Sequence, residues 1–321
     1  MADGTGLSMP DTPANRDAYP PPGSQAKGVG FPQARLVALF RRATGAVVDA
    51  AVGPRRGNPS GENALVRQIA GAVESGRVLL ADRYFAGWFD LVLWHPRGVD
   101  VVTRIHQKRA RDFRRGRRLG RDDHVVRWPK RQRPDGMDRA TYQSLPAELE
   151  VREVRVRVGQ RGFRTRVLVV VTTRTDPAVS AAEIADLYRQ RWQAELDLRS
   201  VTITLGMDVL RCQSPPMVRK EIWAHLLAYN RIRTVMAQAA VAGGREPRSL
   251  SVAAVVQGLS AFSAALATGA GHDVLVRFVL GYRVGDRPDR VEPRMRKRRP
   301  KPYPPLPVPR AEARKRLLGS R

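Results

Sequence analysis

Three acidic residues in different settings, Asp3, Asp82 and Glu195, are the candidates for chemistry in this sequence. Asp82 ends a short apolar run, Arg77–Asp82, and Glu195 lies on a predicted helix. Carboxylate oxygens are the ligands that Mg²⁺ prefers, and two such ions about 3.5 to 4 Å apart can activate a water or a 3′-hydroxyl and stabilise the leaving oxygen. Together, the three acids indicate a two-metal site for phosphoryl transfer.

Each acid also has a structural interpretation. Asp82 can cap the helix that follows it, Asp3 can be an ordinary loop residue, and Glu195 can pair with Arg191 or Arg199. Motifs for other chemistries are absent from the sequence: there is no Walker A loop, no Gly-x-Gly-x-x-Gly after a strand and no Gly-x-Ser-x-Gly elbow.

Glu195 lies in a stretch that we predict as one helix, Ser180–Gly206. Ser180 and Glu183 form a capping box, and Gly206 marks the end. At about 100° per residue, residues three, seven and fourteen positions after Tyr188 lie on nearly the same side of a helix as Tyr188 does. One side of this helix therefore carries a stripe of a phenol, a guanidinium, a carboxylate and a hydroxyl. The stripe consists of Tyr188, Arg191, Glu195 and Thr202. A solvated helix face can look like this, and so can a site for a metal ion and a phosphate.

The elements before this helix predict a mixed α/β sheet. In order they are a strand Ala34–Phe40, a strand Ala46–Val52, a helix Asn63–Val73, a strand Arg77–Asp82, a helix Gly87–Pro96 and a strand Val99–Arg104. Functional residues of such sheets gather at strand ends, which is where Asp82 falls. The opening stretch Met1–Pro13 is rich in Gly and Pro and predicts a loop around Asp3.

A strongly basic segment follows, because residues 104–133 contain thirteen Lys and Arg against three Asp. Such density is typical of a phosphate-contact surface, although a solvated loop is an alternative. The candidate DNA contacts here are Arg114, Arg115, Arg117 and Arg118. Alternation in Glu150–Val158 and Thr165–Thr173 predicts a β-hairpin, so residues 106–176 form a mostly β, basic insertion. Trp128 is expected to pack in it rather than to stack on a base.

The remaining chain predicts helices and a tail. A helix runs from Ser214 to Gly243 with an apolar face, followed by a helix Ser249–Ala267 and a short segment Val274–Leu280. From Pro293 onwards an extended basic arm is expected. The predicted organisation is a core in two parts (1–105 and 177–242), the insertion (106–176), a helical segment (243–287) and a disordered Pro-rich tail (288–321).

Charge and composition narrow the function. The 57 Lys and Arg against 30 Asp and Glu give a net charge of +27, which favours a polyanionic partner, or else reflects an Arg-rich composition from a GC-rich genome. No apolar run approaches the roughly 18 residues of a membrane span. Cys212 is the only cysteine, which excludes an internal disulfide and a cysteine-based zinc site. We therefore expect a nucleic-acid-binding protein of the cytoplasm, without a membrane partner.

Three motifs at their spacing carry a family resemblance. They are Asp3-Gly4-Thr5, Ala81-Asp82-Arg83 and the Tyr188, Arg191, Glu195 pattern. The sequence resembles the DDE transposases of bacterial insertion sequences, specifically the insertion-sequence-family-four group, from Asp3 to about Ala240. That group has a Tyr-x2-Arg-x3-Glu-x6-Lys signature, in which Thr202 stands here at the lysine position, beside the DNA.

The resemblance implies a ribonuclease H-like mixed α/β sheet with flanking helices, interrupted by the β insertion. Because Asp3 lies next to the start of the chain, it also implies an amino-terminally truncated form with its first central strand largely missing. Asp3, Asp82 and Glu195 would be catalytic and would hold Mg²⁺, or Mn²⁺ as a substitute. Tyr188 and Arg191 would contact a DNA phosphate.

The implied reaction is cleavage at the transposon ends by water, attack of the freed 3′-hydroxyl, typically through a DNA hairpin, and strand transfer into target DNA. The partners would be double-stranded DNA and a second copy of the chain in a synaptic complex at the bacterial nucleoid. Two alternatives stay open. One is a catalytically inactive relic that only binds DNA, and the other is a host nuclease of the same fold.

Overall fold

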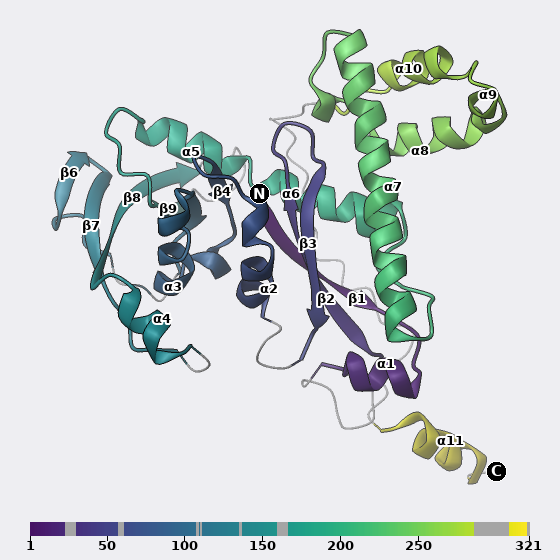
Figure 1. The fold of residues 1–321 in the computed structure, drawn as a ribbon, viewed down its shortest axis with the longest axis horizontal. Helices are drawn as coiled ribbons and strands as arrows, with labels where there is room; N and C mark the ends of the chain where they lie inside the picture. Colours follow the sequence, from purple (N-terminus) through teal and green to yellow (C-terminus); the bar gives the residue numbers. More distant parts are fainter. Residues whose placement is uncertain are drawn as a thin grey trace. The chain divides into compact units, whose positions relative to one another are not determined.

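The computed structural model describes residues 1–22, 30–56, 61–106, 109, 111–134, 137–158, 166–285 and 308–319. The chain forms two compact units, each assembled from separate stretches (Figure 1). The first unit contains Met1–Asp3, Ala38–Ala50 and Val66–Leu198, and the second contains Gly4–Val37, Ala51–Leu65 and Arg199–Arg321. Asp3, Asp82 and Glu195 therefore all belong to the first unit.

The opening stretch is a strand, so the prediction of a loop is wrong. Ala2–Ser8 forms β1, and the strand that was expected to be largely missing is thus present over seven residues. Gly4 lowers the strand propensity of this stretch, so the strand could not be predicted from the sequence. A Cβ at this position would lie 3.2 Å from the Glu62 side chain and 3.3 Å from the Leu36 carbonyl, so close packing accounts for the glycine.

Two sheets are formed by the strands of the described residues. In the smaller sheet the order is β1-β2-β3, where β2 (Gln33–Phe40) and β3 (Val47–Pro54) confirm the predicted hairpin. The larger, mixed sheet has the order β4-β5-β9-β8-β7-β6. Its strands are β4 (Val78–Leu80), β5 (Asp100–Arg104), β6 (Arg117–Gly120), β7 (Asp123–Pro129), β8 (Glu148–Val158) and β9 (Arg166–Thr172).

The basic segment continues the sheet of the core strands. β4 and β5 are parallel, with Leu79 opposite Val101, and β9 then pairs antiparallel with β5, with Thr172 opposite Val102. β8 and β9 confirm the second predicted hairpin, whose turn lies outside the described residues. The sheet, flanked by helices, is the mixed α/β arrangement that the sequence predicts.

Short helices connect the strands of the described residues. The predicted helix Asn63–Val73 is shorter, because α2 (Glu62–Gln68) gives way to a 3₁₀ turn, η2 (Ala70–Ala72). The remaining ones before the Glu195 region are α1 (Pro13–Ala18), η3 (Arg83–Phe85), α3 (Trp88–Val92), η4 (His95–Arg97) and α4 (Arg139–Ser144). The predicted helix Gly87–Pro96 is therefore α3 followed by η4, in which Pro96 takes an early helical position.

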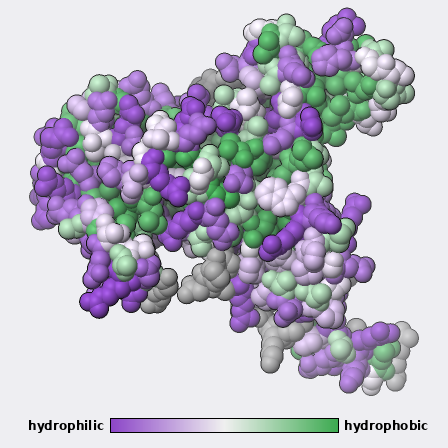
Figure 2. Space-filling view, viewed as in Figure 1, coloured by the Kyte–Doolittle hydropathy of each residue, from purple (hydrophilic) through white to green (hydrophobic). Residues whose placement is uncertain are grey.

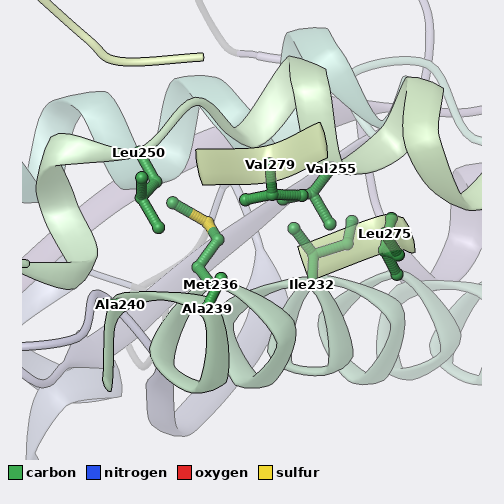
Figure 3. Close-up of a cluster of buried hydrophobic side chains, with 8 residues drawn as sticks. All are labelled: Ile232, Met236, Ala239, Ala240, Leu250, Val255, Leu275 and Val279. Carbon is green, nitrogen blue, oxygen red and sulfur yellow. The ribbon is translucent and has the colours of Figure 1, made fainter. Parts of the chain in front are cut away.

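The second unit has a helical core. Its helices are α7 (Pro215–Ala242), α8 (Val252–Ala261), α9 (Ser263–Ala267) and α10 (His272–Gly281), with the 3₁₀ turn η6 (Pro247–Ser249) between α7 and α8. Figure 3 shows the buried cluster between α7, α8 and α10, with Met236 and Ile232 of α7 facing Val255 and Val279. The predicted helix Ser249–Ala267 is broken at Phe262, between α8 and α9.

The tail is partly helical. Residues 286–307, where most of the extended basic arm was expected, lie outside the described residues. Arg310–Gly319 forms α11, so the prediction of a disordered tail is wrong for this part. No helix in the described part of the chain is both long and apolar enough to cross a membrane.

Candidate active site

Asp82 follows the end of β4, beside the parallel strand β5. Its carboxylate caps η3 by accepting a hydrogen bond from the Arg83 N–H. The buried Thr103 hydroxyl on β5 donates to the Asp82 carbonyl over 2.7 Å. The predicted strand-end position of Asp82 is confirmed, and the neighbouring strand fixes its backbone.

The helix predicted over Ser180–Gly206 is not continuous. The capping box of Ser180 and Glu183 forms as predicted and opens α5 (Ala181–Arg189). A tighter turn then occurs, in which the Arg191 N–H donates to the Tyr188 carbonyl three residues back. α6 (Trp192–Arg199) follows and leads into a π-helical turn, η5 (Ser200–Thr204). Because these turns depart from 3.6 residues per turn, a stripe computed for one regular helix does not hold along its whole length.

Arg191 and Glu195 form an ion pair in the first unit. The Arg191 Nη2 atom lies 2.6 Å from Glu195 Oε1, within one helical turn. The Arg191 side chain is 14% exposed and that of Glu195 is 37% exposed. One of the two pairings considered for Glu195 is therefore present, and the guanidinium is largely shielded from water.

Asp82 and Tyr188 share the electrostatic environment of this pair. Burial raises the pKa of the Tyr188 phenol; the charge of Arg191 opposes this shift, and that of Asp82 adds to it. Burial alone would lower the pKa of Arg191, but the hydrogen bond with Glu195 and the charges of Tyr188, Glu195 and Asp82 raise it above its ordinary value. The fold thus brings Asp82, Tyr188, Arg191 and Glu195 into one interacting group.

Comparison with known proteins assigns the family. A model described as "Transposase DDE domain" matches residues 1–231, well over half of the chain. The chain belongs to the DDE transposase domain family. It is similar to the transposase InsG of insertion sequence IS4 from Escherichia coli K12, with 27% identity over 237 residues, 73% of this chain and 51% of InsG. It is also similar to the IS421 transposase of Escherichia coli, with 36% identity over 61 residues, 19% of this chain and 16% of that one.

These matches support the insertion-sequence-family-four group within the DDE transposases. The alignment with InsG spans about half the length of that protein, and the one with the IS421 transposase spans less. The mixed six-stranded sheet is consistent with the ribonuclease H-like fold of a DDE domain.

The three acids of the DDE pattern are not gathered into a metal cluster in this conformation. Asp3 lies on β1 and is half-buried. In the described part of the chain, no group of three or more His, Cys, Asp or Glu side chains is placed to hold a metal ion. The carboxylates are of the right chemical type for Mg²⁺, but their present arrangement does not fit a shared site, and Glu195 is paired with Arg191.

Thr202 is not an exposed member of the stripe. It lies in η5, in the second unit, and is only 7% exposed, whereas its neighbour Ile203 is 61% exposed. The position that the family signature gives to lysine therefore carries a buried hydroxyl in this DDE domain. A direct contact of Thr202 with DNA would require this turn to open.

The four arginines predicted to contact DNA lie in and just before β6. Asp112 forms ion pairs with two of them, since its carboxylate lies 2.9 Å from Arg114 and 3.4 Å from Arg115. Hydrogen bonds from Arg114 lower the pKa of Asp112 to about 2. Arg117 and Arg118 are exposed on β6. Figure 2 shows predominantly hydrophilic residues over β6 and β7, at the left of the view.

Trp128 packs in the sheet region, as predicted, and is 4% exposed. Its indole N–H donates to the buried Glu153 carboxylate over 2.9 Å, and the Arg109 guanidinium lies 3.6 Å from the centre of its ring. Glu153 also lies 3.3 Å from the buried ring of His124. These bonds satisfy the polar groups of the tryptophan and the carboxylate.

The sequence did not reveal Arg152, which is buried on β8. Its guanidinium donates to both carboxylate oxygens of Asp123, at 2.8 and 2.5 Å. It also donates to the carbonyls of Asp176 and Val179, just before the capping residue Ser180. Arg152 therefore ties β7 and β8 to the start of α5. Simple alternation along β8 does not disclose it, because Val151 and Arg152 are both buried.

Proposed function

We propose that this chain catalyses DNA transposition, by cleavage at the ends of an insertion sequence and transfer of the freed strand into target DNA. The observation that carries the proposal is the group of Asp82, Tyr188, Arg191 and Glu195, which interact within a chain of the DDE transposase family. The net charge of +27 supports double-stranded DNA as the substrate.

Each residue of the group has a role suited to a phosphodiester. The Tyr188 phenol, whose pKa is raised above its ordinary value by burial, is protonated at neutral pH and can donate a hydrogen bond to a phosphate oxygen. The Arg191 guanidinium remains charged and can donate two parallel hydrogen bonds to the same phosphate. These groups would orient the scissile phosphate, while Thr103 and the β4–β5 pair hold Asp82 in place.

Asp3, Asp82 and Glu195 are the residues proposed to hold Mg²⁺, or Mn²⁺ in its place, once Glu195 is released from Arg191. When bound, the metal would activate a water or a 3′-hydroxyl for attack on phosphorus. Arg114, Arg115, Arg117 and Arg118 are proposed to contact DNA on the basic part of the sheet. A homodimer bridging two transposon ends, located at the nucleoid, would complete the assembly.

A second candidate function is DNA binding without catalysis. It is favoured by the separation of the three acids among the described residues and by the Arg191–Glu195 ion pair. Such a protein would bind DNA with strong salt dependence, since each neutralised phosphate of duplex DNA adds about −0.9 to the slope of log K against the logarithm of salt concentration.

A cleavage assay separates the two functions. The purified chain would be incubated with end-labelled DNA that carries the sequences flanking its own reading frame, with Mg²⁺, Mn²⁺ or a chelator. Transposition chemistry predicts metal-dependent nicks that leave 3′-hydroxyl ends and are lost in Glu195→Gln, while DNA binding is retained. Undiminished cleavage by Glu195→Gln would contradict the active-site assignment, and binding without any nick would favour the non-catalytic function.

A further inference from the structure

A cationic pocket of about 400 Å³ lies on the β8–β9 part of the larger sheet. Its walls, in the described part of the chain, combine guanidinium groups with apolar side chains and include no carboxylate. The lining residues are Arg111, Phe113, Arg155, Arg157, Val167 and Val169. Neither Arg155 nor Arg157 stood out in the sequence, because they belong to the alternating strand that predicted the hairpin.

Strand register explains why the pocket forms. Arg155 and Arg157 are two residues apart on β8, so they project from the same face of the sheet. Each lies opposite a valine of β9, Arg155 opposite Val169 and Arg157 opposite Val167. The two valines of β9 thus form the apolar part of the pocket, and the two arginines of β8 lie beside them. Arg111, from the segment before β6, completes the cationic part.

Aromatic stacking holds one of these arginines in place. The Arg155 guanidinium lies 4.2 Å from the centre of the Phe113 ring, and that ring stacks on His124 with 4.3 Å between centres. Arg155 also donates to the Asp122 carboxylate over 3.1 Å. A guanidinium fixed in this way loses less conformational freedom when it binds an anion.

Positive charge at the pocket is only partly compensated. Arg111 is bonded to the Arg109 carbonyl at 3.3 Å, which does not neutralise its charge. Arg157 is exposed and makes no ion pair with another described residue. An adjoining pocket of about 520 Å³ shares Arg111 and adds Arg109, Arg115 and Arg127, together with the carboxylates of Asp112 and Glu153. Burial, and after it the nearby charge of Arg131, lower the pKa of Arg109, whereas the charge of Glu153 opposes this shift.

We propose that the pocket of Arg111, Arg155 and Arg157 binds a backbone phosphate of DNA, and that it is a principal phosphate contact of this sheet. This inference rests on the proposed function, since it takes DNA as the substrate. Planar guanidinium groups match the geometry of phosphate oxygens, and a contact to a backbone phosphate reads no base. The contact is therefore independent of base sequence.

The test compares two pairs of substitutions that remove the same charge. Arg111→Gln/Arg157→Gln removes two guanidinium groups from the pocket, whereas Arg97→Gln/Arg139→Gln removes two exposed ones from residues outside it that have no proposed DNA contact. Affinity of the full chain for a short mixed-sequence duplex would be measured by fluorescence anisotropy over a series of salt concentrations. The pocket pair should weaken binding about tenfold or more and lower the salt slope by about 1 to 2, and the control pair should have a clearly smaller effect.

Equal losses of DNA affinity in the two double variants would contradict the proposed phosphate site, because the overall positive charge of the chain would then explain the affinity. Unchanged DNA affinity of Arg111→Gln/Arg157→Gln would also contradict the proposed phosphate site. If this variant still nicked DNA, the proposed function would nevertheless stand. A wild-type chain that binds no duplex would contradict both. The exposed single variant Arg157→Gln, checked by circular dichroism, provides the same comparison against Arg139→Gln if the double variant does not fold.

Discussion

The guanidinium of Arg191 lies 2.6 Å from the carboxylate of Glu195, and the charge of Asp82 reaches the same guanidinium. Two of the acids expected to bind metal are therefore arranged around a cation that the protein itself supplies. The guanidinium is bonded to the Glu195 carboxylate and is also attracted by the charge of Asp82, so it stabilises both carboxylates in their charged form. It also places Tyr188 where its ionisation reports on the group.

Tyr188 should titrate above the ordinary tyrosine pKa of about 10, since burial and Asp82 disfavour its phenolate. Between that value and the higher pKa of the folded chain, the folded state binds more protons than the unfolded state. Stability should accordingly fall as the pH rises through this window. The difference between the ultraviolet titration curves of wild type and Tyr188→Phe gives the ionisation of the Tyr188 phenol. Arg191→Gln should raise the pKa of Tyr188 further, and a decrease would contradict the proposed grouping.

Arg152→Met should destabilise the first unit by about 3 to 5 kcal/mol, because it leaves the buried Asp123 carboxylate without its partner. Urea unfolding measures the loss. Hydrogen exchange should also show reduced protection at the start of α5, where Arg152 binds the Asp176 and Val179 carbonyls. Arg127→Met is the matched control on the same sheet. Its ion pairs are exposed and 3.9 Å long, so it should change stability by less than about 1 kcal/mol.

The double variant Arg152→Met/Asp123→Leu should recover part of the stability lost by Arg152→Met, because no buried charge remains unpaired. Equal stability of Arg152→Met and wild type would show that the guanidinium does not hold this region together.

Gly258→Ala should destabilise the helical core of the second unit. A Cβ at this position on α8 would lie 2.7 Å from Leu275 and 2.9 Å from the Phe278 ring of α10. Overpacking costs about 1 to 3 kcal/mol, and the better helix propensity of alanine returns at most about 1 kcal/mol. Gly281→Ala at the end of α10 has open space and serves as the control. Thermal unfolding followed by circular dichroism should separate them, and equal melting temperatures would contradict the close packing of α8 and α10.

Much of the fold could be predicted from local pattern. The hairpin of β2 and β3, the capping box at Ser180 and the apolar face of α7 are all encoded within short stretches of sequence. β1 could not be predicted, because its glycines suit a loop and only the approach of Glu62 and Leu36 explains Gly4. The break at Arg191 leaves no local signal either, since no Gly or Pro marks it.

The candidate site likewise contains residues whose positions could be predicted from local sequence and residues whose positions could not. The position of Asp82 at a strand end followed from the apolar run before it, and the pairing of Arg191 with Glu195 was one of two pairings open at helical spacing. Arg152 and the Arg155–Arg157 pocket depend on partners far along the chain. Such contacts are set by register and tertiary packing, which the spacing of residues in one strand does not specify.

Thr202→Lys should lower stability instead of supplying the cation of the family signature. Thr202 is 7% exposed, and burying an amine there without a partner would cost about 2 kcal/mol or more. Ile203→Lys is the matched control, because the next residue in the same turn is 61% exposed and a lysine there can remain in water. Urea unfolding should show a loss for the first variant only. If Thr202→Lys instead tightened DNA binding at unchanged stability, η5 would have to open toward DNA, and Thr202 would return to the list of DNA contacts.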